Sequence, residues 1–500
     1  MNKTLKWILI GVGAGLGVFV IGAGIAYAVM TDTPDLDREI GVLEELLPKG
    51  PVSYVVGADL NAAAKLYKGS RIGHLARKHE IDKDFSNLER IAKVQEQTKG
   101  RFWDVFGARF IYAKYGDENY LIITQPGWKV KAMWRTIIAS GEKKEPGEIP
   151  YTVFTGGTAC FFAGDYFWYA SSEKLLLSAL KIASSEDVEE KAFSMRSKIE
   201  PLAYGISRRQ GKYLVFDEAR WVVQEGEKGI EGIVQIDNPS GVIGGFIAKA
   251  ETPRDYSKIP ADATLFISLT GVSPYRAWKE AGMLSSEKGI TEVLGDLEIE
   301  KEFAKIAVDL QDEVLFIMQG WDVDRWYAPA RWLVSVKAGS ERSFESWTAL
   351  TPWFFPTAWD TTLTYGDVAY TYLDLGEDLP PISYLFNEAY LTVASDSTLV
   401  PWILEAQAAS MTLDKSEEFA TYCETAAIKK PVAYVNWSLF KEEFKEYLIY
   451  AADRTSGFTP ADVDEKLFPL LDALEMKALL VEMEHKGKTL AFTIRSAKGE

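Results

Sequence analysis

The chain has little of the residues that most catalytic and metal sites use. Its 500 residues include two cysteines, Cys160 and Cys423, and three histidines. Two cysteines so far apart cannot form a disulfide framework and do not have the spacing of a metal site, although they leave a single bridge open. So few histidines also leave few candidates for a histidine base or a common zinc site. The sequence therefore predicts no metal and no other cofactor.

A surplus of positive charge is lacking as well. The formal net charge is −17, whereas a nucleic-acid-binding surface needs clustered Lys and Arg with few acids between them. We therefore expect no nucleic acid partner. With 47% hydrophobic and 25% charged residues, the composition is that of a globular protein with a sizeable core.

One long uncharged apolar run is present, from Trp7 to Met30. A helix needs about 20 apolar residues to cross a bilayer, so this run predicts a transmembrane helix at residues 7–30. Lys3 and Lys6 precede it and several acids follow it, beginning with Asp32. The positive-inside rule then places a short tail in the cytoplasm and the remainder outside it.

This prediction gives a single-pass protein of the inner (cytoplasmic) membrane. Residues 1–6 form the cytoplasmic tail, residues 31–47 a juxtamembrane linker, and the carboxy-terminal domain lies in the periplasm or outside the cell. The alternative is a signal peptide cleaved after Ala28, since Ala26-Tyr27-Ala28 suits signal peptidase. The run exceeds the usual 7 to 15 residues of a signal-peptide core, which favours an uncleaved anchor.

Glycines recur at four-residue spacing in the predicted helix. Such pairs let a second helix approach the backbone closely, so they are candidates for packing within the membrane. They are Gly11, Gly13, Gly15 and Gly17.

Internal repetition is the most informative pattern in the rest of the chain. Four segments open with a short β-branched or aromatic run and pass into a helical pattern, which predicts a strand followed by a helix. They are residues 51–65, 201–216, 261–278 and 431–447. A β-hairpin pattern with typical turn residues follows each one. The four hairpins are predicted at residues 107–125, 233–250 (with a turn at Asn238-Pro239-Ser240-Gly241), 313–338 and 478–497.

A further pair of segments, 167–180 and 391–404, runs from a strand into a helix through Ala-Ser. Ala170-Ser171-Ser172 matches Ala394-Ser395-Asp396, and Leu175 matches Leu399. The part beyond the linker is therefore predicted to be a tandem duplication, with copies at 48–252 and 258–500. Strands and hairpins that alternate with helices, without strict strand-helix-strand crossovers, indicate an α+β fold with largely antiparallel sheets and packed helices.

With this plan the chain resembles membrane-anchored bacterial envelope proteins of unknown function, which carry an amino-terminal membrane helix and a duplicated strand-helix-hairpin ectodomain. The resemblance implies a location and an architecture. It carries over no functional residue.

Two short patterns could belong to an enzyme. Ser171 to Lys174 spells S-x-x-K, but a serine between a strand and a helix is explained by capping of the helix, and the second copy drops the lysine. Asp322 and Asp324 could share a divalent cation, although acids are also ordinary residues of a hairpin tip. We predict no catalytic and no metal-binding residue from either pattern.

Aromatic residues are concentrated between Trp321 and Trp359, where most such rings would fill a core. Residues 350–360 (LTPWFFPTAWD) show neither a helical nor a strand period, so we expect a loop there. An exposed aromatic loop serves a partner protein, a glycan or a membrane interface. The interaction candidates are Trp353, Phe354, Phe355 and Trp359.

The distinctive features are thus an anchor and surfaces, including a basic stretch at residues 61–101 that suits anionic lipid, an acidic partner or plain solvation. We expect a non-catalytic scaffold or accessory subunit of a membrane-associated assembly, not an enzyme. Its partners would be other membrane or envelope proteins, and the bilayer through the amino-terminal helix. A lipid- or glycan-binding periplasmic module is the alternative, and a carboxylate-dependent hydrolase or transferase is the second.

Overall fold

The structure is a computed structural model in which two compact units are distinguished. They comprise residues 1–69 with 80–207 (unit 1) and residues 70–79 with 208–500 (unit 2). The structure describes residues 42–58, 74–75, 107, 109–116, 118–145, 149–183, 201–208, 216–226, 229–247, 249–253, 256–274, 276–277, 302, 305–306, 308–322, 330–354, 358–375, 381–454 and 459–498.

Unit 1 is built on an antiparallel sheet with the strand order β8-β1-β2-β3-β7-β6-β5-β4. The strands are β1 (Ser53–Gly57), β2 (Phe110–Lys114), β3 (Tyr120–Thr124), β4 (Glu142–Lys144), β5 (Tyr151–Val153), β6 (Ala159–Ala163), β7 (Tyr166–Ala170) and β8 (Pro201–Arg208). All five residues of the inner strand β3 are buried, so both faces of the sheet are covered there.

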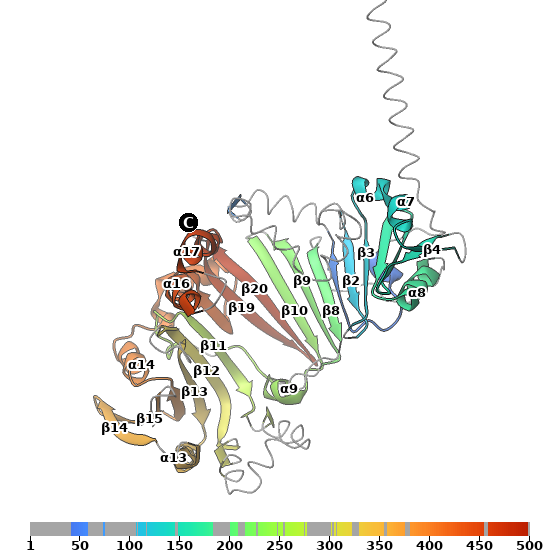
Figure 1. The fold of residues 1–500 in the computed structure, drawn as a ribbon. Helices are drawn as coiled ribbons and strands as arrows, with labels where there is room; N and C mark the ends of the chain where they lie inside the picture. Colours follow the sequence, from blue (N-terminus) through green and yellow to red (C-terminus); the bar gives the residue numbers. More distant parts are fainter. Residues whose placement is uncertain are drawn as a thin grey trace, which may run out of the picture. The chain divides into compact units, whose positions relative to one another are not determined.

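Helices pack against this sheet, and Figure 1 labels α6, α7 and α8 among them. They are η1 (Leu43–Leu46), α6 (Trp128–Ala132), α7 (Trp134–Ile138) and α8 (Glu173–Ala183). On one face, Tyr120 and Ile122 of β3 join Trp134 and Ile137 of α7 in a core cluster. On the other, α8 contacts β3, β6, β7 and η1.

Unit 2 contains a longer antiparallel sheet. Its order is β9-β10-β20-β19-β18-β11-β12-β13-β17-β16-β15-β14. The strands are β9 (Glu218–Gly226), β10 (Gly229–Asp237), β11 (Leu265–Val272), β12 (Leu310–Trp321), β13 (Ala330–Ala338), β14 (Trp359–Tyr365), β15 (Val368–Asp374), β16 (Ile382–Asn387), β17 (Tyr390–Ala394), β18 (Ala433–Asn436), β19 (Met476–Lys486) and β20 (Thr489–Lys498).

The helices of unit 2 also lie on both faces of its sheet (Figure 1). They are α9 (Gly241–Ile247), α13 (Arg342–Phe354), α14 (Leu399–Ala408), η3 (Leu413–Lys415), α15 (Glu417–Ala426), α16 (Trp437–Arg454), α17 (Pro460–Asp462), η4 (Val463–Leu467) and α18 (Phe468–Asp472). Phe266 of β11 and Ile317 of β12 pack with Phe419 of α15 in the largest cluster of this unit. The described part of the chain thus confirms an α+β fold with antiparallel strand pairs and packed helices.

The strand order of unit 1 recurs within unit 2 as β18-β11-β12-β13-β17-β16-β15-β14, and the register recurs too. In unit 1, Tyr54 pairs with Ala113 and Ile206, and in unit 2 Phe266 pairs with Ile317 and Tyr434. Leu121 likewise pairs with Ala113 and Ala170, as Leu333 pairs with Ile317 and Ala394. All ten of these paired residues are buried: Tyr54, Ala113, Leu121, Ala170, Ile206, Phe266, Ile317, Leu333, Ala394 and Tyr434.

The strands β10 and β20 form an antiparallel seam inside unit 2. Arg495 Nε donates to Glu231 Oε1 across it at 2.8 Å, and Arg495 Nη1 donates to the Ala427 carbonyl at 3.0 Å, at the end of α15. Thr489 Oγ1 also donates to Asp237 Oδ1, at 2.7 Å. The seam therefore joins a hairpin from the first predicted copy to the last strand of the second.

The hairpin predicted at 233–250 is wrong. Its first half is the end of β10, whose hairpin partner is β9, and its second half is the helix α9. Gly241 has a φ of +72°, and a Cβ on Gly244 would lie 2.5 Å from the Pro239 carbonyl carbon. The turn residues thus start a tightly packed helix, which periodicity over so few residues cannot distinguish from a strand.

The loop predicted at 350–360 is also wrong at both ends. Helix α13 continues to Phe354 with Pro352 inside its last turn, and Trp359 begins β14. Leu350 is buried and packs with Trp347, one helical turn earlier, and with Ile306. This packing extends the helix across a segment whose prolines predict a break.

The predicted membrane helix at 7–30 and its glycines lie outside the described residues. Among the residues that are described, no helix is both long enough and apolar enough to cross a bilayer. Residues at the end of the predicted linker, Leu43, Leu46 and Leu47, are buried in unit 1.

The serines of the two Ala-Ser segments have matching structural roles. Ser171 Oγ accepts a hydrogen bond from Tyr120 N at 3.0 Å, and Ser395 Oγ accepts one from Trp332 N at 2.9 Å. The next residue caps the helix in each case: Ser172 Oγ accepts from Leu175 N at 3.4 Å, and Asp396 Oδ1 from Leu399 N at 3.2 Å. Ser172 therefore has the capping role that was predicted for this segment, whereas the Ser171 hydroxyl bonds to the start of β3.

We predict that Asp396→Ala lowers the free energy of unfolding at pH 7 by about 1–3 kcal/mol, because Asp396 caps α14 and pairs with Arg331. Burial alone would raise the pKa of the Asp396 carboxyl, but hydrogen bonds from Thr398 and the charge of Arg331 hold the pKa below its ordinary value. A lowered folded-state pKa means that this stabilisation is present at neutral pH and is lost as the pH falls through that value.

Urea denaturation at pH 7 and at acidic pH measures both effects. Ser416→Ala removes the neutral cap of α15 and serves as the control, with a loss of about 1 kcal/mol that does not depend on pH. An Asp396→Ala effect that is equal at the two pH values would contradict the assignment.

Candidate functional site

Of the predicted interaction candidates, Trp359 is the one whose side chain is described. It is 80% exposed, the most exposed large apolar side chain of the described residues. It begins β14, which ends the sheet of unit 2 and pairs with β15 alone among the described strands. Trp353 and Phe354 belong to α13, although their side chains are not described, and Phe355 lies outside the described residues.

Strand β4, at the end of the unit 1 sheet opposite β8, and strand β14, at the end of the unit 2 sheet opposite β9, differ in length and charge. Strand β4 has three residues, Glu142, Lys143 and Lys144, all charged. Strand β14 has seven residues, WDTTLTY, with Asp360 as its single charge, and most of them are exposed. Short, charged end strands resist pairing with another chain. A longer end strand with few charges presents unpaired backbone groups with which another chain can pair.

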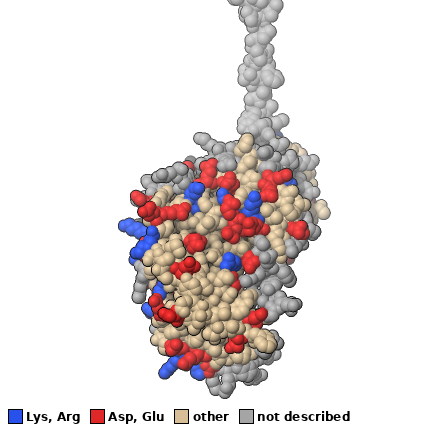
Figure 2. All heavy atoms as spheres, turned by 90° about the vertical axis from the view of Figure 1, so that its left-hand side faces the viewer, with Lys and Arg blue, Asp and Glu red and all other residues tan. Residues whose placement is uncertain are grey.

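Side chains that could bind a metal ion together do not cluster in the described part of the chain. No group of three or more His, Cys, Asp or Glu side chains there could hold a metal ion. Figure 2 shows acidic side chains scattered over the face in view, with Lys and Arg between them. Asp322 follows β12, whereas Asp324 lies outside the described residues.

Several described carboxyls have a displaced pKa, and in every one the pKa is lowered. Hydrogen bonds from Lys144 and Tyr151 lower the pKa of Glu173, for example, and hydrogen bonds from Lys466 and Thr459 lower that of Asp462 to about 2. A general acid needs the opposite displacement. The two cysteines are both free, and burial raises the pKa of each thiol, so neither has the character of an activated nucleophile.

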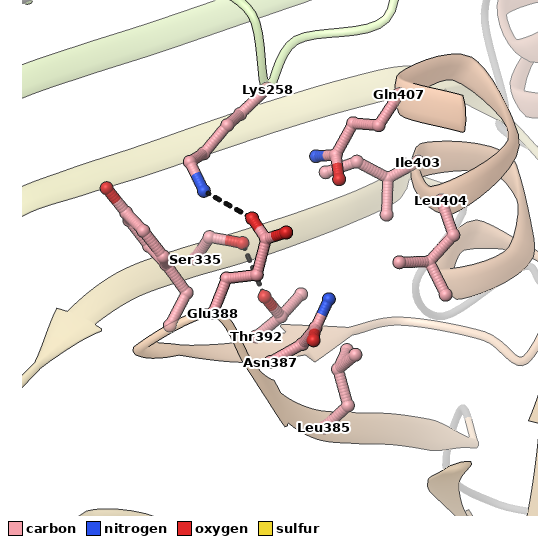
Figure 3. A pocket seen from close by; sticks show the side chains of 10 residues that line it. Lys258, Ser335, Leu385, Asn387, Glu388, Thr392, Ile403, Leu404 and Gln407 are labelled. Atoms are coloured by element: carbon pink, nitrogen blue, oxygen red, sulfur yellow. Dashed lines mark hydrogen bonds and ion pairs between the residues drawn. The ribbon is translucent and has the colours of Figure 1, made fainter. Parts of the chain in front are cut away.

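A small pocket in unit 2 is lined wholly by described residues. Its cavity volume is about 30 Å³, room for about two water molecules. Strands β13, β16 and β17, helix α14 and the segment before β11 form it (Figure 3). The lining residues are Lys258, Ser335, Leu385, Asn387, Glu388, Tyr390, Thr392, Ile403, Leu404 and Gln407.

Polar groups converge on this pocket from separate parts of the chain, as Figure 3 shows. The hydroxyl groups of Ser335 and Thr392 share a buried hydrogen bond of 2.6 Å. Lys258 Nζ lies 3.5 Å from Glu388 Oε2 and 3.9 Å above the centre of the Tyr390 ring. The pocket therefore combines one cation with hydroxyl and amide groups on an apolar wall.

The turn that carries Glu388 is strained. It joins β16 to β17 through two residues, Glu388 with a φ of +47° and Ala389 with a φ of +65°. Two-residue hairpin turns favour positive φ at both positions, which is why Gly and Asn predominate there. Non-glycine residues in this region are uncommon, and here they place the Glu388 carboxylate beside Lys258.

Sequence reasoning did not identify this pocket. Its residues come from four separated segments, and Ser335 and Thr392 belong to strand patterns that look like ordinary sheet positions. The signal that was available is the turn sequence Asn387-Glu388-Ala389-Tyr390, which lacks the glycine that its conformation favours. Comparison of the chain with family models, with curated proteins and with solved structures gives no match.

We predict that Ala389→Gly raises the free energy of unfolding by about 0.5–1 kcal/mol, because glycine adopts the left-handed conformation without the cost that a Cβ imposes. Urea denaturation of the full-length chain measures the change. Ala369→Gly, at an exposed position of β15, is the matched control and should lower the free energy by about 0.5–1 kcal/mol. Equal losses for the two variants would contradict the strained turn.

Proposed function

We propose that the protein is a non-catalytic, membrane-anchored envelope component that acts as a scaffold or accessory subunit and binds a partner protein through β14. The observation that carries the proposal is the exposed end strand of unit 2 with Trp359 at its start. An extended segment of another envelope protein would add a strand to this edge, with main-chain hydrogen bonds for affinity. Trp359 would supply the buried aromatic contact that such interfaces depend on.

The charge pattern of β14 supports a strand as the occupant. A strand that approaches β14 meets threonine, leucine and tyrosine side chains and the one carboxylate of Asp360. The equivalent approach to β4 of unit 1 meets the charges of Glu142, Lys143 and Lys144. The charges of β4 thus oppose pairing with another strand, whereas β14 is suited to it.

The proposed architecture is a tandem duplication held outside the cytoplasm by the helix at 7–30. The recurring strand order, the matching register at buried positions and the matching roles of Ser171 and Ser395 support two copies of one plan. The resemblance to membrane-anchored bacterial envelope proteins agrees with this proposal. In it the first copy includes β9 and β10, which pack with the second copy through the β10–β20 seam.

We predict that Trp359→Ser, or the charge-adding Thr362→Lys, abolishes co-purification of the partner with the tagged full-length chain in mild detergent. Both changes leave the thermal unfolding midpoint nearly unchanged, because these side chains are exposed. Mass spectrometry of the captured proteins is the measurement. The control is Leu177→Ser on α8, a second exposed apolar side chain, at 39%, which should retain the partner.

If the wild-type chain captures no partner reproducibly, or if both β14 variants keep it, the scaffold proposal is wrong. Capture of a second copy of the chain alone would make the edge a self-association surface and would equally contradict a distinct partner.

A further inference from the structure

We infer that the pocket of unit 2 is a binding site for the carboxylate group of a small ligand. The inference uses the strand-by-strand equivalence of the two units proposed above. It does not depend on the scaffold role of β14, and its experiment uses other residues.

The place in unit 1 that corresponds to the pocket is filled. Leu121 and Leu333 are equivalent by register, and two residues further along the strands lie Ile123 and Ser335. Ile123 pairs with Trp168, and Trp168 pairs with Phe161. The Trp168 and Phe161 rings stack with centroids 4.4 Å apart. Ile123, Phe161 and Trp168 are each 0% exposed, so large buried side chains fill this part of unit 1.

In unit 2 the same three positions carry smaller or more polar side chains. Ser335 pairs with Thr392, and Thr392 pairs with Leu385. The absence of the two large rings leaves the cavity. Ile403 fills part of it, at the position that matches Ala179 of unit 1. Packed cores exclude such voids, so a cavity with hydroxyl groups on its floor is a feature that needs an occupant or water.

The rim of the pocket is also more polar than the matching part of unit 1. Lys258 corresponds to Leu46, since each lies eight residues before a matched position, Phe266 and Tyr54. The backbone forms the same turn around Leu46 and Lys258. Leu47 N donates to Glu44 O and Ile259 N donates to Tyr256 O, both at 3.1 Å.

The two amide residues of the rim show the same change from apolar to polar. Asn387 stands where unit 1 has Ala163, and Gln407 stands where it has Ala183. The polar lining of the pocket is therefore present in one copy and absent from the other, which an ordinary structural requirement of the fold does not explain.

The volume and the donors select the ligand class. About 30 Å³ accepts a group of two or three non-hydrogen atoms and excludes a ring, so the pocket holds the end of a ligand. Lys258 supplies a cation, and the Asn387 and Gln407 side-chain amides supply N–H donors. Charge-assisted hydrogen bonds of this kind favour a carboxylate. Ile403, Leu385 and Leu404 suit a short apolar chain beside it.

Glu388 already places a carboxylate at Lys258. Its side chain is 71% exposed, so it can turn into solvent at little cost when a ligand carboxylate replaces it. Glu388 thus acts as an internal competitor, held at the pocket by the strained turn. Free small acids and the carboxyl terminus of a peptide share the chemistry that the pocket recognises.

The experiment measures binding of carbon-13 propionate to the full-length chain in detergent, from the broadening of its carboxylate resonance, with propionamide as the uncharged competitor. Wild-type protein should broaden the signal, and propionamide should compete poorly. Glu388→Gln should bind about twofold to fivefold more tightly, because it removes an exposed ion pair. Lys258→Met should weaken binding about tenfold or more, because the charged donor is lost.

Controls separate the pocket from general effects. Lys415→Met removes another exposed lysine of unit 2, which pairs with Asp414, and should leave propionate binding unchanged. Gln407→Ala introduces the residue found at the equivalent place in unit 1 and should also weaken binding. It provides a second test of the pocket if the Lys258 variant does not fold. Competition by trialanine, but not by trialanine amide, identifies the carboxyl terminus of a peptide as the source of the bound carboxylate. Failure of both to compete identifies a free small acid.

The inference is overturned if neither the wild type nor Glu388→Gln broadens the propionate signal. It is also overturned if propionamide competes as well as propionate does, or if Lys258→Met binds as the wild type does.

Discussion

The register of the antiparallel strand pairs is the constraint on which the rest of the structure depends. Side chains alternate between the two faces of a strand, so a shift of one residue would move every buried side chain to the other face. In unit 1 the register puts Tyr54, Leu121 and Ala170 on one buried face. In unit 2 it puts Phe266, Leu333 and Ala394 on one face in the same relation. Hydrogen bonds from Tyr120 N and Trp332 N to Ser171 and Ser395 close the ends of the same strand pairs in both units.

The same register accounts for the difference between the units. Because β3, β7 and β6 are aligned as they are, Ile123, Trp168 and Phe161 meet in one layer and fill it. The equivalent alignment of β13, β17 and β16 brings Ser335, Thr392 and Leu385 together, and these leave a cavity. The same strand order and pairing thus carry a core in one unit and a pocket in the other, because the side chains at these positions differ in size and polarity. The difference between β4 and β14 at the ends of the sheets is of the same kind, since length and charge decide which edge can accept another strand.

Much of the fold could be predicted from sequence because its patterns are local. Alternating apolar residues with turn residues between them identified the hairpins β2–β3, β12–β13 and β19–β20, and the Ala-Ser segments identified β7 with α8 and β17 with α14. The prediction failed where tertiary packing decides, at α9, where a glycine packs against Pro239, and at α13, which buried Leu350 carries past Pro352. The pocket was not predictable because Lys258, Ser335 and Gln407 meet only through long-range pairing, and none of them has a local pattern that marks it. Trp359 could be identified as an exposed candidate from the lack of periodicity around it, although it begins a strand and does not lie in the predicted loop.

Disulfide trapping between neighbouring strands tests the shared register most directly. Directly opposite residues of an antiparallel pair have Cα atoms about 4.5–5.5 Å apart, within reach of a disulfide. The account predicts that the full-length chain with Ser335→Cys and Thr392→Cys forms this bridge under mild oxidation, detected by peptide mapping, because these residues are partners in β13 and β17. It predicts no bridge between Ser335→Cys and Val393→Cys, since Val393 pairs with Val334 and faces the other side of the sheet. A bridge in the second variant and none in the first would show a register shifted by one residue, and neither the pocket nor the equivalence of the two units would then stand.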